Sequence, residues 1–512
     1  MKMSIKDFKT DYISHPLKYI ILAAMILRLV SAFFAKGYGM HDDHFLVIES
    51  SYSWVKGYDY NHWLPSDDGS TPQPSGHSFF YPALHFLTFS VLDKMGIASL
   101  DAKMYIIRIL HALFSLLIVF FAYKLTFRAS GDRKTANLVG WTTAILWCLP
   151  WLSVRNLVEI FCIPFLLGST WFYVRKEEKP SIGDVIISGL LMGCAFSVRF
   201  QVIFFIGGFG LAMLIYKRWR DAVLWSVAVI AAVCLTQISD LFVWGEPFVE
   251  LREYVNYNFF HSGDYLSGSF FKYFGVLLGL LAPPLSVLLL FGFFYGFRRL
   301  FLFLPAFCFL LFHSLFPNKQ ERFIFPIIPS VIVLGFVGCY DFYQKYKEKR
   351  GRQLLKTFKV VGIISLVINL ILLVPVTVHY SKRARVESMV YISHFQDVKS
   401  ILVENTNNDS YKMFPKTYSG YNFSDIPLTA ENKEKFYASA ENGVPDVDFI
   451  FFDGTKNLDQ RVAEVKTVYP DITFEADVKP SFIDKLLHRM NPRHIVNEEI
   501  VIYRNNPVRN NK

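Results

Sequence analysis

Acidic and basic side chains interrupt or directly follow several apolar runs of this chain, where lipid would exclude them. They include the adjacent pair Asp42-Asp43 and the residues Arg155, Glu159, Arg199, Asp240, Lys319, Glu321 and Arg322. A charge at the bilayer centre costs about 2.5–3.5 kcal/mol on insertion scales, so such charges are retained where they serve one another or a ligand. We therefore expect them to meet in one polar site.

The Asp42-Asp43 pair has the chemistry of a proton acceptor. Two adjacent carboxylates raise one another's proton affinity, so one of them is suited to accept a hydroxyl proton near neutral pH. The alternative is an exposed acidic turn that caps a helix beginning at Phe45. The flanking His41 and His44 also leave a divalent metal site open as a third interpretation, although the expected chemistry requires no cofactor.

The basic residues have the chemistry of phosphate ligands. Arg199 and the run Lys319-Gln320-Glu321-Arg322 place cations at the ends of apolar runs, where guanidinium and ammonium groups donate charge-assisted hydrogen bonds to phosphate oxygens. Anchoring of a helix end at the membrane–water interface would explain any one of these basic residues alone. Glu159 follows Arg155 by about one helical turn, so the two are also candidates for a structural ion pair.

The elements that position these residues are predicted to be membrane helices. The chain has 512 residues, 53% of them hydrophobic, and a mean hydropathy of +0.30, which is typical of an integral membrane protein. About twenty apolar residues span a bilayer core. About eleven segments fit that length or approach it, near 17–36, 104–127, 137–152, 157–174, 183–198, 200–216, 221–243, 273–297, 300–316, 323–343 and 358–380. All six cysteines fall inside these segments, so we expect no disulfide framework.

The basic residues also predict the orientation. The first span follows Lys2, Lys6, Lys9 and Lys18 and has no small-residue cleavage site after it, so it reads as a cytoplasmic-side anchor, not a removed signal peptide. Alternate loops are then basic: Arg128 to Lys134, Arg175 to Lys179, Lys217 to Arg220, Arg298-Arg299, and Lys345 to Lys356. This topology accounts for the net charge of +10, so we expect no nucleic-acid partner. The unusual charges and the C-terminus then face the non-cytoplasmic side.

Two domains are expected. Residues 1–382 form the transmembrane domain, including a first outer loop at 37–80, whose amphipathic run from Phe45 to Trp54 predicts a helix in the headgroup layer. Residues 383–512 read as a small α/β domain. Strands are expected at 447–452 and 499–503, and helices near 431–440 and 458–467. The amphipathic stretch 482–494 is interpreted as an ordinary surface helix, with a bilayer-surface helix as the alternative.

In their order, these residues resemble glycosyltransferase family 22, the polyprenyl-phosphate-mannose-dependent mannosyltransferases with a GT-C fold. The matching stretches are Asp42 to Phe45 with Glu49, His77 to Pro82, Arg155-Asn156 with Glu159, Arg199, Asp240 to Gly245, Tyr257 to Phe260, and Asn318 to Phe323. Asn318 stands where the family has His, Gln320 where it has Glu, and His77 where it has Arg. These departures bear on the donor sugar and acceptor more than on the reaction class.

The resemblance implies an inverting transfer of a sugar, mannose in this family, from a polyprenyl phosphate to a glycan or glycolipid on the non-cytoplasmic face. It implies Asp42 as the base, with Asp43 or Glu49 positioning the acceptor or tuning Asp42. The implied substrate-binding set is His41, His44, Glu49, His77, Arg155, Glu159, Arg199, Asp240, Tyr257, Asn258, Lys319, Gln320, Glu321 and Arg322. The implied partners are membrane lipids, the lipid-linked donor and the acceptor, with no metal required.

Two other functions stay open from the residues alone. A lipid or glycolipid transporter or flippase would also line its route with buried charges, but the sequence shows no inverted repeat and no interrupted helices in matching halves. A noncatalytic subunit of a glycan-assembly complex would account for Asn318 and Gln320. The divergent signatures favour a bacterial cytoplasmic membrane, with the endoplasmic reticulum membrane as the alternative.

Overall fold

The computed structural model describes residues 11–60, 62–65, 74–261, 268–407, 412–420, 422–440, 443–492 and 497–506. They belong to two compact units. Unit 1 comprises Met1–Phe34, Gly57–Thr88 and Tyr105–Val378, and unit 2 comprises Ala35–Lys56, Phe89–Met104 and His379–Lys512. This division differs from the expected domains, because residues 35–56 and 89–104 pack with the C-terminal part of the chain. The lysines at positions 2, 6 and 9 lie outside the described residues.

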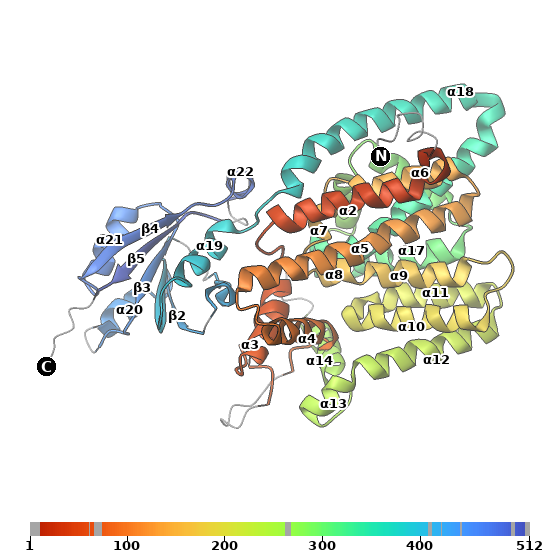
Figure 1. The fold of residues 1–512 in the computed structure, drawn as a ribbon. Helices are drawn as coiled ribbons and strands as arrows, with labels where there is room; N and C mark the ends of the chain where they lie inside the picture. Colours follow the sequence, from red (N-terminus) through yellow and green to blue (C-terminus); the bar gives the residue numbers. More distant parts are fainter. Residues whose placement is uncertain are drawn as a thin grey trace. The chain divides into compact units, whose positions relative to one another are not determined.

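Unit 1 is a bundle of helices (Figure 1). Its elements are α2 (Pro16–Phe34), α4 (Phe80–Lys94), α5 (Leu100–Ser130), α6 (Arg133–Ile145), α7 (Leu149–Leu152), α8 (Val158–Phe161), α9 (Ile163–Val174), α10 (Ile182–Val198), η2 (Phe200–Val202), α11 (Ile203–Ile215), α12 (Trp219–Thr236), α13 (Ile238–Trp244), α14 (Val249–Phe260), α15 (Lys272–Leu280), α16 (Leu285–Tyr295), α17 (Leu300–Leu315), η3 (Glu321–Ile327) and α18 (Ile328–Thr377). The boundary between the units falls inside α4 and α5.

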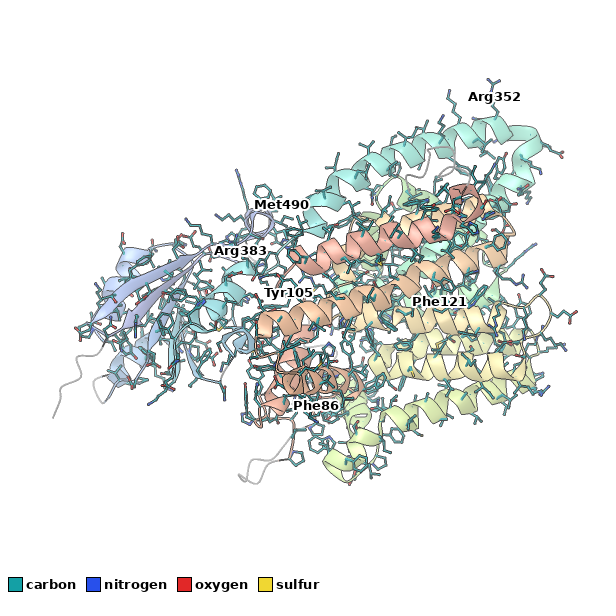
Figure 2. The ribbon with its side chains drawn as sticks, viewed as in Figure 1. Phe86, Tyr105, Phe121, Arg352, Arg383 and Met490 are labelled. Carbon is teal, nitrogen blue, oxygen red and sulfur yellow. The ribbon has the colours of Figure 1, made fainter. Side chains whose placement is uncertain are left out.

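Among the described residues, four helical segments are long and apolar enough to cross a membrane, and the bent pair α16 and α17 would make a fifth. Several shorter apolar helices accompany them, as expected for the short segments between 157 and 216. The chain is therefore a polytopic membrane protein, while the count of about eleven spans stays a prediction. Figure 2 shows Phe121 on α5, within this bundle.

One expected loop is helical instead. We expected a basic loop at Lys345 to Lys356 between two spans, but both spans are arms of the single helix α18. The ribbon of α18 changes direction sharply, and Arg352 lies at the turn (Figures 1 and 2). Lys, Glu, Arg, Gln and Leu dominate this stretch and are good helix formers, so the backbone turns without leaving the helical conformation.

The second arm of α18 satisfies backbone groups that broken helices leave open. Asn369 accepts a hydrogen bond from Trp147 N at 2.8 Å and donates one to Ile145 O at 2.8 Å, at the break between α6 and α7. Ser365 accepts from Leu285 N at 2.9 Å, at the break between α15 and α16. An unpaired backbone group inside a bilayer costs several kcal/mol, so these side chains stabilise the interruptions.

We expect Asn369→Ala to destabilise the protein by about 1–3 kcal/mol, because it leaves one partly buried N–H and one partly buried carbonyl without their partner. Leu370→Ala is the matched control, since Leu370 is the exposed neighbour on the same helix. Thermal unfolding in detergent measures both variants. Equal melting temperatures for the two would contradict the role assigned to Asn369.

The first arm of α18 packs closely against α16. Gly292 of α16 faces Gly335 and Gly338 of α18, and a Cβ atom at Gly292 or Gly338 would collide with the backbone carbonyl of the facing helix. Small residues at such contacts let membrane helices approach closely enough for dispersion forces to act. The contact fixes the helix that directly follows η3.

Unit 2 is built on a five-stranded sheet of order β2-β1-β3-β5-β4. Its elements are η1 (Asp43–Glu49), α3 (Ser50–Val55), α19 (Arg383–Ile392), β1 (Ser400–Asn405), η4 (Lys416–Ser419), β2 (Ser424–Thr429), α20 (Lys433–Ala440), β3 (Phe449–Asp453), α21 (Leu458–Lys466), β4 (Ile472–Val478), α22 (Phe482–Met490) and β5 (Ile500–Asn505). Strands β2, β1 and β3 are parallel to one another. Strand β5 pairs antiparallel with β3, and β4 pairs antiparallel with β5. β3 and β5 overlap the expected strands at 447–452 and 499–503, whereas β1, β2 and β4 lie where no strand was expected.

The run from Phe45 to Trp54 does not present an apolar face outward. Phe45, Ile48 and Tyr52 are each at most 3% exposed, inside unit 2. The prediction of a helix in the headgroup layer is therefore wrong, because the apolar side chains of this run are buried in the protein. Residues 61 and 66–73 of the first outer loop lie outside the described residues.

Candidate active site

A buried carboxylate, Glu159, joins three separate segments of unit 1. Glu159 belongs to α8 and is 0% exposed. Arg199, at the C-terminal end of α10, forms an ion pair with it through Nη1. Arg322 of η3 approaches the same carboxylate oxygen, with its Nε at 3.6 Å. The two arginines are thus brought together as the sequence predicted, and these three side chains carry one net positive charge.

Aromatic and amide groups orient the two arginines. The ring of Phe323 lies 5.0 Å from the Arg199 guanidinium carbon and 5.7 Å from that of Arg322. Arg199 Nη2 donates to Gln201 Oε1, which also lies 3.3 Å from His313 Nε2. Arg199 Nε is buried without a hydrogen-bond partner in the described part of the chain. A buried charged donor of this kind is suited to an anionic ligand.

Arg155 takes a position that the spacing did not predict. Its guanidinium carbon lies 4.3 Å from the ring of Trp151, and Arg155 precedes α8, which begins at Val158. The ion pair between Arg155 and Glu159 is predicted on the premise that both residues lie in one continuous helix. That premise is wrong, because the chain is not helical between α7 and α8, and the ion pairs that the structure gives Glu159 run to Arg199 and Arg322.

The residues from Lys319 to Arg322 make different contacts. Lys319 Nζ donates to Ser314 O at 2.8 Å and Phe316 O at 2.6 Å, so its ammonium group satisfies carbonyls at the end of α17. Glu321 pairs with Lys272 at 2.8 Å. Gln320 accepts from Arg322 Nε at 2.9 Å and so holds the guanidinium group beside Glu159.

A second acidic cluster fixes the segment that contains His77. Glu250 Oε2 accepts from Ser75 Oγ at 2.9 Å and from His77 N at 3.2 Å, and Asp240 Oδ2 accepts from Glu250 N at 3.0 Å. Burial raises the pKa of Glu250 to about 7, against the hydrogen bond from Ser75, and the Asp240 carboxylate adds to the rise. Asp240 therefore positions the start of α14.

The other two predicted residues of α14 lie further along the helix. Asn258 donates to Tyr254 O at 2.8 Å, within its own helix. The Tyr257 ring is partly exposed and stacks on His261 with centroids 5.1 Å apart. The substrate-binding role of both residues stays a prediction.

The Asp42-Asp43 pair lies in unit 2, at the start of the π-helical turn η1. Asp43 is buried, whereas Asp42 is partly buried and makes no side-chain cap, so the proposed helix cap is absent at this position. His41 lies beside them, and partial burial of its ring lowers its pKa below the usual value for histidine. The pair therefore sits on a turn whose position is set by other residues.

His44 and Glu49 hold that turn in place. Glu49 accepts hydrogen bonds from Thr417 N at 3.1 Å and Thr417 Oγ1 at 3.0 Å, and His44 Nε2 lies 3.2 Å from Glu49 Oε1. The His44 ring stacks on Tyr38 and Tyr418, with centroids 4.7 and 5.8 Å apart. These contacts explain why residues 35–56 belong to unit 2. Within the described residues, no group of three His, Cys, Asp or Glu side chains could hold a metal ion.

Sequence reasoning missed several residues that shape these clusters. Gln201, His313 and Glu250 lie in these clusters without belonging to a sequence motif. Phe323 is the last residue of the matching stretch Asn318 to Phe323, and its ring lies beside both arginines. Gln237 donates to Ser78 Oγ, next to His77. His313 and Gln237 lie within apolar runs, and that burial was an available signal. Glu250 gave none, because Ser75 and His77, which its side chain holds, lie more than 170 residues away in the chain.

Breaking the Glu159–Arg199 pair from one side is expected to cost about 3–5 kcal/mol, because it leaves the partner charge buried. We expect Glu159→Gln and Arg199→Met to lower the melting temperature by less together than the sum of their separate effects. The exposed pair Glu246–Arg252 is the matched control, and its corresponding variants should have small, additive effects. Additive losses for Glu159 and Arg199 would contradict the pairing.

Comparison with solved structures defines the class of protein. Over 96% of this chain and 98% of the other, the fold matches that of ArnT from Cupriavidus metallidurans bound to undecaprenyl phosphate, with a TM-score of 0.63 and 12% identity. It also matches the oligosaccharyltransferase of Archaeoglobus fulgidus over 85% of this chain and 67% of that one, with a TM-score of 0.57 and 11% identity. The chain is a polytopic membrane protein with the GT-C fold.

The family follows from the sequence. The Alg9-like mannosyltransferase family matches residues 19–418, so the chain belongs to this family, and the resemblance to glycosyltransferase family 22 is confirmed. GPI mannosyltransferase 3 of Yarrowia lipolytica is 25% identical over 337 residues, 64% of this chain and 63% of that protein. Alpha-1,2-mannosyltransferase ALG9 of Homo sapiens is 23% identical over 60% of this chain and 52% of its own length. The matches thus span less than two thirds of these curated relatives.

Proposed function

We propose that this chain is an integral-membrane mannosyltransferase that uses a polyprenyl-phosphate donor. The sugar passes to a glycan or glycolipid acceptor on the non-cytoplasmic face, with inversion at the anomeric carbon. Membership of the Alg9-like mannosyltransferase family supports the reaction class. The low identity to eukaryotic relatives agrees with the divergence from which we predict a bacterial cytoplasmic membrane.

The Glu159–Arg199–Arg322 cluster carries the proposal. Two arginines share one carboxylate, and the buried Arg199 Nε supplies a further donor. A lipid phosphate leaving group needs positive charge more than a proton, because its oxygens gain negative charge as the glycosidic bond breaks. Undecaprenyl phosphate is the ligand in the solved ArnT structure of the same fold, which supports a lipid phosphate as the ligand here.

Lys319 is a weaker candidate for the phosphate than its sequence position indicated. Its ammonium group is engaged by the carbonyls of Ser314 and Phe316. We therefore assign the phosphate to Arg199 and Arg322, with Gln320 and Glu159 as positioning residues that hold the two guanidinium groups.

Asp42 is proposed as the base. Its carboxylate accepts the proton of the acceptor hydroxyl, the hydroxyl oxygen forms the new bond to the anomeric carbon, and the electron pair of the broken bond leaves on the lipid phosphate. Asp43, next to it in the chain, positions the acceptor. Glu49 acts through His44 and Thr417, which fix the turn that carries both aspartates.

A transfer assay tests the function directly. The purified wild-type protein, given a radiolabelled polyprenyl-phosphate mannose and lipid-linked glycan acceptors, should form a new glycosidic bond. Lipid movement across a vesicle membrane without a new bond would instead support the transporter. Donor binding without product from any acceptor would support the noncatalytic subunit.

We expect Asp42→Asn to lower turnover by about 10²–10⁴-fold, the usual contribution of a general base, while donor binding is retained. The matched control is Glu246→Gln, an exposed carboxylate of unit 1 whose loss should leave turnover unchanged. Near-normal turnover by purified Asp42→Asn protein would rule out this residue as the base.

A further inference from the structure

Helix α22 of unit 2 has its apolar side outward. Phe482, Leu486 and Met490 recur every four residues and are 80%, 46% and 74% exposed. The buried residue of this helix is a carboxylate, Asp484. Residues two positions apart on a helix point about 160° away from each other, so the exposed Leu486 and the buried Asp484 lie on opposite sides. A helix of a water-soluble domain has the reverse arrangement.

Asp484 fixes α22 to the start of α19. Asp484 Oδ2 accepts from Arg383 N at 3.3 Å, and Ser481 Oγ accepts from Asp484 N at 3.1 Å as the helix cap. His379 Nε2 lies 3.7 Å from Asp484 Oδ1. Figure 2 labels Arg383 on α19 and Met490 at the end of α22. The side of α22 that carries Asp484 thus contacts the rest of unit 2, and the apolar side is left exposed.

Those contacts also locate α22 along the chain. Residues His379 and Arg383 follow Thr377, the last residue of α18, by two and six positions. The second arm of α18 belongs to the last candidate membrane span. Helix α22 therefore contacts the residues that directly follow that span in the chain.

The rim of the apolar face is basic. Lys485 and Arg489 are exposed on α22, beside Phe482, Leu486 and Met490. Basic side chains flanking an apolar helical face match a bilayer surface, where the apolar groups enter the headgroup boundary and the cations meet anionic lipid. Long basic side chains extend to the headgroups while their stems stay on the apolar surface.

From this arrangement we propose that α22 lies on the membrane surface, with Phe482, Leu486 and Met490 in the lipid and Lys485 and Arg489 at anionic headgroups. The contact anchors unit 2 to the bilayer at a second place, in addition to the chain connection through α18. The stretch that the sequence favoured as an ordinary surface helix is thereby assigned to its alternative.

An environment-sensitive fluorescent amino acid, incorporated in the full-length protein in nanodiscs, tests the contact. The probe replaces Leu486 in one variant and Met490 in a second, so that a folding failure of one variant does not decide the outcome. The control carries the probe in place of Lys466, an exposed residue of α21. We expect blue-shifted emission at 486 and 490, and quenching by lipids with bromine on their acyl chains, with neither effect at 466.

Emission at 486 and 490 that matches position 466, without quenching, would overturn the proposal. Blue-shifted emission that brominated lipid does not quench would also overturn it, because a protein surface would then cover the helix. In nanodiscs with anionic lipid, the Lys485→Glu/Arg489→Glu variant should show at least a twofold loss of quenching. Equal quenching would contradict the assigned role of the two cations.

Discussion

A single buried carboxylate constrains the membrane unit. Glu159 carries its charge at a position with no exposure, and only positive partners make such a charge tolerable. Its partners, Arg199 and Arg322, come from segments far apart in the sequence, so the pairings tie α8, the end of α10 and η3 to one another. The same pairings hold two guanidinium groups together, which is the arrangement that a lipid phosphate needs.

The second constraint is that lipid supplies no hydrogen bonds to an interrupted helix. Unit 1 breaks its helices at 146–148, 153–157 and 281–284, and the second break contains Arg155 and directly precedes α8, which carries Glu159. Asn369 and Ser365 satisfy the backbone groups at the first and third breaks. The second arm of α18, which carries these two side chains, thus stabilises the irregular backbone that a polar site in a membrane requires.

The sequence predicted the parts of the site that depend on topology and order. Arg199 and Arg322 were expected together because both follow apolar runs on the same side, and the motif order identified the family. The prediction from the sequence failed where a local premise was wrong. Arg155 and Glu159 do not share a helix, and the ammonium group of Lys319 donates to carbonyls at the end of α17. Contacts such as Ser75–Glu250 or Glu49–Thr417 could not be predicted, because side chains distant in sequence meet only through the fold.

The central claim is that the two arginines beside Glu159 bind the phosphate of a lipid donor. Native mass spectrometry of the purified protein with a polyprenyl phosphate tests it most directly, comparing Arg322→Ala with Arg252→Ala, an exposed arginine of the same unit. We expect the lipid to bind at least about tenfold more weakly to Arg322→Ala, the loss of one charge-assisted contact, and normally to Arg252→Ala. Equal binding of the lipid by the two variants would contradict the claim.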